Sequence, residues 1–141
     1  HDLIIKALKI VDKYRSKGVD LFGRYRSKIN SLSVGAEMKV GLIKGWDGGS
    51  DDGLKLLTDI YDLEKAIIQE AKKMILVLSS GKGTWEISSG QLLFDSTEDM
   101  TSYNGHFEMM NLIIKEQEEI RKKSVDQMGA RLQVLDEALN R

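Results

Sequence analysis

Apolar residues in the last third of the chain recur at intervals built from three and four. This pattern covers residues 97–140 and comprises Met110, Ile113, Ile120, Met128, Leu132, Leu135 and Leu139. The spacing is that of one face of an α-helix. A helix of this length would reach roughly 60 Å, which is longer than a compact domain of this size is wide. Another part of the chain must therefore run alongside it.

The first part of the chain predicts another long helix, from Asp2 to about Leu32. Its apolar face has an average spacing of about 3.5 residues, the heptad value of helices that pack along a seam. This face comprises Ile4, Leu8, Val11, Tyr14, Gly18, Leu21, Tyr25, Ile29 and Leu32. Further apolar residues widen the stripe, as in a bundle helix with more than one neighbour. These are Leu3, Ala7, Ile10 and Phe22.

Glycine-rich segments divide the first half of the chain. Ser31–Gly35 interrupts the pattern, which can then resume either as one bent helix or as a second helix in series. Residues 45–50 (Gly-Trp-Asp-Gly-Gly-Ser) predict a tight turn, because glycine adopts the positive-φ conformations that a reversal needs. A helix is expected from Asp51 to Leu78, with acidic residues in its first turn. Residues 1–79 therefore predict an antiparallel helical hairpin.

A short β-hairpin is expected before the last helix. Residues 84–87 alternate with period two, and residues 91–94 are their partner across Ser88-Ser89-Gly90. A lone two-stranded hairpin is marginal in water, so it should pack on the helices. The side chains expected to do so are Trp85, Ile87, Leu92 and Phe94.

The predicted fold class is therefore mainly α. It is a bundle of three long helices: an antiparallel helical hairpin over residues 1–79 and a long C-terminal helix over residues 96–141. A small β-hairpin is inserted around residues 84–94, within a loop segment of 80–95. One domain is expected, because 141 residues favour a single core.

Composition excludes several functions. Lys and Arg number 21 against 22 Asp and Glu, so the chain has no basic excess with which to bind nucleic acid. Without cysteine it can form neither disulfides nor thiolate metal sites. No segment approaches the 18–20 or so apolar residues that cross a bilayer. No classical signal peptide is visible, so both secretion by another route and a cytoplasmic location fit the sequence.

Candidate chemistry is sparse. His106 could join Asp99, Ser102 and Glu108 in a metal site, but neither Glu-x-x-His nor His-x-x-x-His spacing accompanies it. Residues 79–84 depart from the phosphate-binding loop pattern, and residues 47–53 depart from the calcium-binding loop pattern. We therefore expect no cofactor, no metal and no catalytic residues.

Two resemblances bear on function. Trp46-Asp47-Gly48 between two helices resembles the turn of the small secreted helical-hairpin proteins named for a Trp-x-Gly motif. That resemblance implies type VII export and dimerisation through the hairpin. It covers residues 1–79, and the chain lacks the family's Tyr-x-x-x-Asp/Glu tail signal. The layout of long helices around a small mixed insert is similar to needle-tip and filament proteins of type III secretion, which implies export.

The function expected from the sequence is therefore non-enzymatic. We expect an interaction or structural protein, a substrate or component of a bacterial secretion system, with contacts to a protein partner or to itself through helix faces. Residues proposed to bind the partner are Trp46, Met109, Met110, Met128 and Leu132. The alternative is a small helical enzyme or ligand-binding bundle centred near His106, Asp99 and Tyr103.

The middle of the last helix has a polar waist at Lys115–Ser124. Gln117, Arg121 and Ser124 stand where apolar residues should fall. The waist is either a solvated overhang or a stretch that faces a partner, and we expect the overhang.

Overall fold

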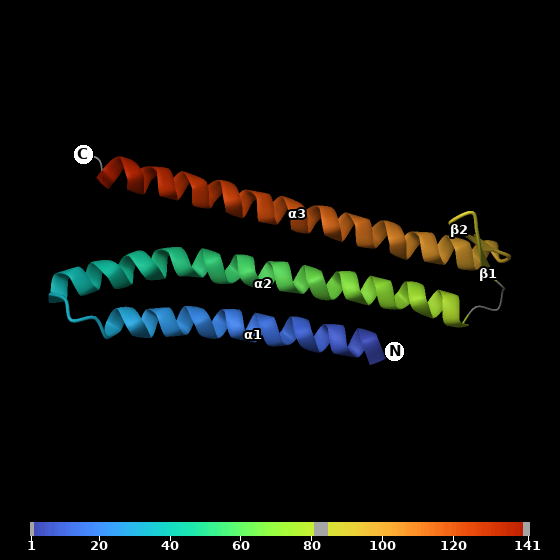
Figure 1. Cartoon of the computed structure of the whole chain (residues 1–141), viewed down its shortest axis with the longest axis horizontal. Coiled ribbons are helices and arrows are strands. Elements are labelled where there is room, and N and C mark those ends of the chain that lie inside the picture. The colour runs from blue at the N-terminus through green and yellow to red at the C-terminus, as the bar shows by residue number, and fades with distance from the viewer. Residues whose placement is uncertain (1, 81–84, 140–141) are drawn as a thin grey trace.

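The chain forms three long helices and one β-hairpin (Figure 1). Their order is α1 (Asp2–Asn30), α2 (Ala36–Ser80), β1 (Trp85–Ser88), β2 (Gln91–Phe94) and α3 (Thr97–Leu139). The structure, a computed structural model, describes residues 2–80 and 85–139, with side chains as far as residue 127. The predicted mainly α fold, with three helices and an inserted hairpin, is confirmed.

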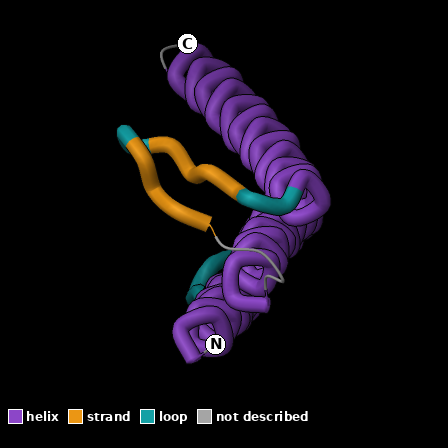
Figure 2. The backbone as a smooth tube through the Cα atoms, turned by 90° about the vertical axis from the view of Figure 1, so that its right-hand side faces the viewer, coloured by secondary structure: helices purple, strands orange, loops and turns teal. Residues whose placement is uncertain are grey.

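The second helix lies between the other two. Figure 1 shows α1 and α3 side by side with α2, one on each side of it, and both pack on α2. The perpendicular view in Figure 2 shows α1, α2 and the start of α3 following one another in line. The helices therefore form a single layer, in which α2 is the main neighbour of both edge helices. Toward its C-terminal end α3 diverges from α2 (Figure 1).

The predicted turn over residues 45–50 is wrong. This segment lies inside α2, which begins at Ala36 and not at Asp51. The chain reverses instead at Ser31–Gly35, the segment whose continuity the sequence left open. The antiparallel hairpin thus exists, but its turn lies earlier in the chain, so the resemblance to a Trp-x-Gly turn does not hold.

Tertiary contacts with α1 account for the helical conformation of this glycine-rich segment. The Trp46 ring packs against Phe22 and Tyr25, with ring centroids 5.9 and 5.7 Å apart. Asp47 accepts two hydrogen bonds from the Arg26 guanidinium, at 2.7 and 2.9 Å. Each glycine costs a helix about 1 kcal/mol relative to alanine. Packing of the two intervening side chains on α1 offsets that cost.

Two further glycines let α1 and α2 approach closely. A Cβ atom on Gly18 would lie 2.5 Å from Leu57 Cδ2, and one on Gly53 would lie 3.0 Å from the Phe22 ring. A larger residue at either position would have to displace these side chains. Glycine therefore permits the close approach of these side chains here and does not mark a turn.

The polar waist of α3 packs on α2, so the expected overhang is wrong. The Gln117 side chain is only 7% exposed and donates a hydrogen bond to the Ile60 carbonyl, at 3.4 Å. Arg121 pairs with Glu64 at 3.0 Å. The less exposed positions of α3 alternate in steps of three and four, the repeat of a helix seam. They include Tyr103, His106, Met110, Ile113, Gln117, Ile120 and Ser124.

The β-hairpin has the expected pairing. Trp85 pairs with Phe94 and Ser88 with Gln91, in antiparallel register. The connecting residues Ser89 and Gly90 both have positive φ, 51° and 78°, as a two-residue primed turn requires. Residue 84, also expected in the first strand, lies outside the described residues.

The paired side chains of Trp85 and Phe94, at the open end of the hairpin, attach it to the helices. Trp85 Nε1 donates a hydrogen bond to the Leu78 carbonyl at 2.8 Å, near the end of α2. The Phe94 ring packs on Tyr103 of α3, with centroids 5.4 Å apart. Ile87, which we expected to pack as well, stays exposed.

Substitution of Gly48 by alanine tests the helical conformation of the predicted turn. A Cβ atom at Gly48 meets nothing within 4 Å. Gly48→Ala should therefore raise the free energy of unfolding by about 0.5–1 kcal/mol, the difference in helix propensity. The control is Gly90→Ala. Because Gly90 has a φ of +78°, this substitution should lower the free energy of unfolding by about 1 kcal/mol. Urea denaturation measures both, and a destabilising Gly48→Ala would contradict the continuous helix.

Candidate protein-interaction surface

Two apolar seams run along α1, next to one another on its circumference. One seam faces α2 and contains Ile4, Leu8, Val11, Gly18 and Phe22, which are partly buried. The other, which we call the outward seam, contains Leu3, Ala7, Ile10, Tyr14, Leu21 and Tyr25. Its residues follow one another mainly in steps of three, four and seven, as in a heptad seam. All but Ala7 are exposed, from 51% at Leu21 to 79% at Leu3.

The opposite border of the contact between α1 and α2 is closed by charged side chains. Three ion pairs form there: Arg15 with Asp62 (3.2 Å), Lys65 with Asp12 (2.9 Å) and Arg26 with Asp47 (2.7 Å). Helical rotation of about 100° per residue places the α1 members of these pairs on one side of the α2-facing seam and Leu21 on the other. The hydrogen bond from Arg26 holds the pKa of Asp47 below its ordinary value. Only the border with the outward seam is apolar.

Positive charge follows the outward seam on the side away from α2. We call this row the basic rim: Lys6, Lys13, Lys17, Arg24 and Lys28. Lys17 Nζ lies 5.7 Å from the centroid of the Tyr14 ring, which places the rim directly beside the seam. Arg24 pairs with Asp20 at 2.6 Å. Over the whole of α1, eight Lys or Arg residues stand against three Asp.

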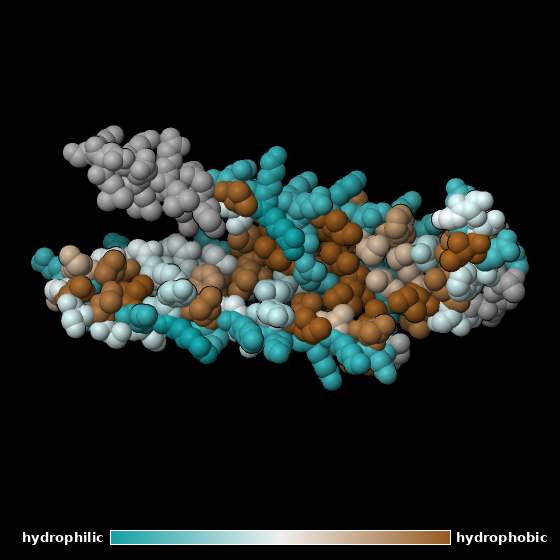
Figure 3. Space-filling view, in the orientation of Figure 1, coloured by the Kyte–Doolittle hydropathy of each residue, from teal (hydrophilic) through white to brown (hydrophobic). Residues whose placement is uncertain are grey.

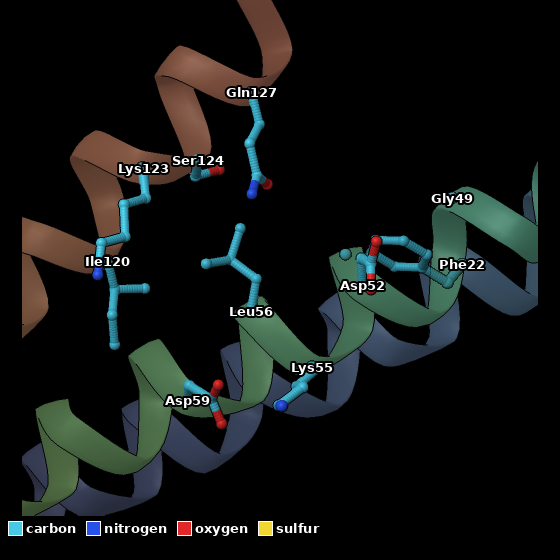
Figure 4. Close-up of a pocket in the computed structure, with 11 residues that line it drawn as sticks. Phe22, Gly49, Asp52, Lys55, Leu56, Asp59, Ile120, Lys123, Ser124 and Gln127 are labelled. Carbon is cyan, nitrogen blue, oxygen red and sulfur yellow. The ribbon is translucent and has the colours of Figure 1, made fainter. Parts of the chain in front are cut away.

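A hollow opens where α3 diverges from α2 (Figure 4). It has a volume of about 650 Å³ and is lined by Phe22, Leu56 and Ile120, with charged and polar side chains around them. In Figure 4, Leu56 points from α2 into the space below Ser124 and Gln127 of α3. A second hollow, of about 620 Å³, follows α2 alone past Val40 and Ile43. Both are open surface depressions and neither is lined by His106.

The residues proposed from the sequence for partner binding are scattered. Trp46 packs on α1, Met110 is partly buried, and Met109 is exposed on α3. The side chains of Met128 and Leu132 lie outside the described residues. Of the outward seam, Leu3, Ala7 and Ile10 are among the extra apolar residues of the widened stripe in the sequence, whereas the other three residues belong to its main face. That stripe predicted more than one neighbour for this helix, but it was not assigned to a partner.

His106 belongs to a charged cluster between α2 and α3. Its Nδ1 atom lies 2.8 Å from Glu70 Oε2, and Lys73 Nζ donates a hydrogen bond to Glu70 Oε1 at 2.6 Å. Glu70 is only 8% exposed, and its pKa is lowered by the hydrogen bond from Lys73, against burial, which raises it. The contact with His106 lowers it further. The cluster joins α3 to α2.

The other residues of the alternative enzyme site have structural contacts of their own. The Asp99 amide donates a hydrogen bond to Ser96 Oγ at 3.2 Å, which caps the start of α3. Tyr103 packs on Phe94 of the hairpin. Among the side chains of residues 2–80 and 85–127, no group of three His, Cys, Asp or Glu residues is placed to hold a metal ion.

The two loop motifs fare differently. Residues 47–53, weighed as a calcium-binding loop, are helical within α2. Ser79 and Ser80, weighed as part of a phosphate-binding loop, end α2, and residues 81–84 lie outside the described residues. None of the described helices combines the length and hydropathy that a membrane span needs.

Comparison with protein-family models, curated proteins and solved structures gives no match to this chain. Function must therefore be argued from the surface itself.

The cluster at Glu70 predicts a pH-dependent contribution to stability. A lowered folded-state pKa stabilises the fold above the ordinary pKa of a carboxyl group, and this contribution is lost as pH falls through the lowered value. Glu70→Gln should therefore reduce the free energy of unfolding at pH 7, by about 1–2 kcal/mol. The difference from the parent chain should shrink toward pH ~3.

Urea denaturation across this pH range measures the effect. Glu108→Gln, which removes an exposed carboxylate of α3, is the control and should change little. A loss in the free energy of unfolding of Glu70→Gln that stays constant between pH 7 and ~3 would contradict a stabilising role for the Glu70 charge.

Proposed function

We propose that this chain is a non-enzymatic interaction protein, which acts by contacts of its helix faces with another protein chain. The observation that carries the proposal is the scarcity of buried hydrophobic side chains in the described part of the chain. Among the described residues, Met74 alone of the hydrophobic side chains is buried, at 8% exposure. The side chains that would form a core in a compact protein instead remain accessible along the layer.

The exposed area supports the same conclusion. The chain exposes 10735 Å² at a mass of 15.9 kDa, whereas a compact monomer of that mass exposes about 7,300 Å². An extended shape contributes to the excess, but the excess includes apolar surface. Figure 3 shows hydrophobic residues gathered along the middle of one broad face. Contiguous exposed apolar surface of this kind marks protein-interaction sites.

Export by a bacterial secretion system stays a prediction. Its remaining support is the layout of long helices around a small insert, since Trp46-Asp47-Gly48 is helical. The arrangement of helices alone indicates a class of protein and not what the protein does.

Photo-crosslinking in the cells that encode the protein tests the proposal. A benzophenone amino acid at Tyr14, in the outward seam, should give a discrete covalent adduct with a protein chain. At Val19, on the other side of the α2-facing seam and also exposed, it should give little or none. If neither Tyr14 nor the second seam position Ile10, also exposed, yields an adduct, the proposal fails.

A further inference from the structure

We infer that the outward seam of α1 is the docking site for an amphipathic helix with an acidic flank, supplied by another protein. The inference deepens the proposed function, on which it rests, by naming the surface and the chemistry of the partner.

The geometry of the seam specifies a helix as the occupant. Leu3, Ile10, Tyr14, Leu21 and Tyr25 form a narrow stripe about two positions wide in each heptad, and this is the surface that another helix covers in a coiled coil. The α2-facing seam of the same helix already has such a partner. Because α3 packs on α2 at the other edge of the layer, α1 has two apolar seams but only α2 as its main neighbour.

Charge specifies the flank of the partner. The basic rim lies along the open side of the seam, while the acidic residue Asp12 of α1 pairs with Lys65 of α2. In helix pairs, the residues beside the seam set partner choice through opposite charges. A helix that covers the outward seam would therefore place its own flank against Lys6, Lys13, Lys17 and Lys28, where Glu or Asp is favoured.

The same charges disfavour an antiparallel second copy of α1 as the occupant. Two α1 helices that shared this seam in antiparallel orientation would bring their basic rims together, and like charges at such positions are destabilising. An anionic membrane surface fits less well. A helix that lies in the membrane interface has a broad apolar face, whereas here α2 covers the neighbouring side of α1 and leaves only the narrow seam.

The experiment uses the purified chain and two synthetic peptides of about four heptads. Both carry the same Leu and Ile seam, and the flanking positions are Glu in one peptide and Lys in the other. Fluorescence anisotropy should show that the Glu peptide binds at least about tenfold more tightly than the Lys peptide, with affinity that falls as salt rises.

A matched pair of variants locates the site on α1. Leu21 and Val19 are exposed to a similar extent, 51% and 46%, on different sides of the α2-facing seam. Leu21→Glu should weaken the binding of the Glu peptide at least about tenfold, and Val19→Glu should weaken it by no more than about twofold. Circular dichroism confirms that both variants keep their helix content.

Four results would overturn the inference. They are no binding of the Glu peptide, equal binding of both peptides, a dimer of the chain that Leu21→Glu dissociates, and binding to phosphatidylserine vesicles that Leu21→Glu abolishes. The last two would assign the seam to a second copy or to a membrane. An adduct at Tyr14 in cells without binding of the Glu peptide would leave the proposed function standing and remove this inference alone.

Discussion

The packing of α1 and α3 on α2 is the contact on which the rest of the molecule depends. A helix buries its apolar stripe only against a neighbour, and stable domains therefore stack at least two layers. Here three helices lie in one layer, so α2 is covered from both edges while each edge helix is covered mainly from one. The scarcity of buried side chains follows directly from this arrangement. Met74, the one buried hydrophobic residue described, belongs to the central helix.

Continuity of α2 is what makes the layer long. The helix runs through residues 45–50 because Trp46 and Asp47 both have partners on α1. On the other side, Glu70 and Ile60 hold α3 through His106 and Gln117. Polar contacts thus position both edge helices at places where apolar burial is slight. Such contacts align helices well but contribute little net stability when they are exposed to water.

The sequence predicts the elements because their periods and end signals are local. The heptad spacing of α1, the cap at Ser96 and the Ser89-Gly90 turn each depend on residues close in the chain. The errors concern features that distant residues decide. Glycine at position 53 is equally consistent with a turn and with close packing, and only the Phe22 ring distinguishes them. Gln117 looked solvated because its partner, the Ile60 carbonyl, lies on another helix.

For the same reason, the sequence predicts only part of the candidate site. A widened apolar stripe on residues 2–32 predicts two neighbours, but a sequence cannot say which of them the chain itself supplies. The structure supplies α2 to one seam, and ion pairs close that contact on the side away from Leu21. The remaining seam keeps a heptad repeat and a one-sided basic rim. An exposed apolar stripe without a partner would need neither feature, whereas recognition of an acidic helix uses both.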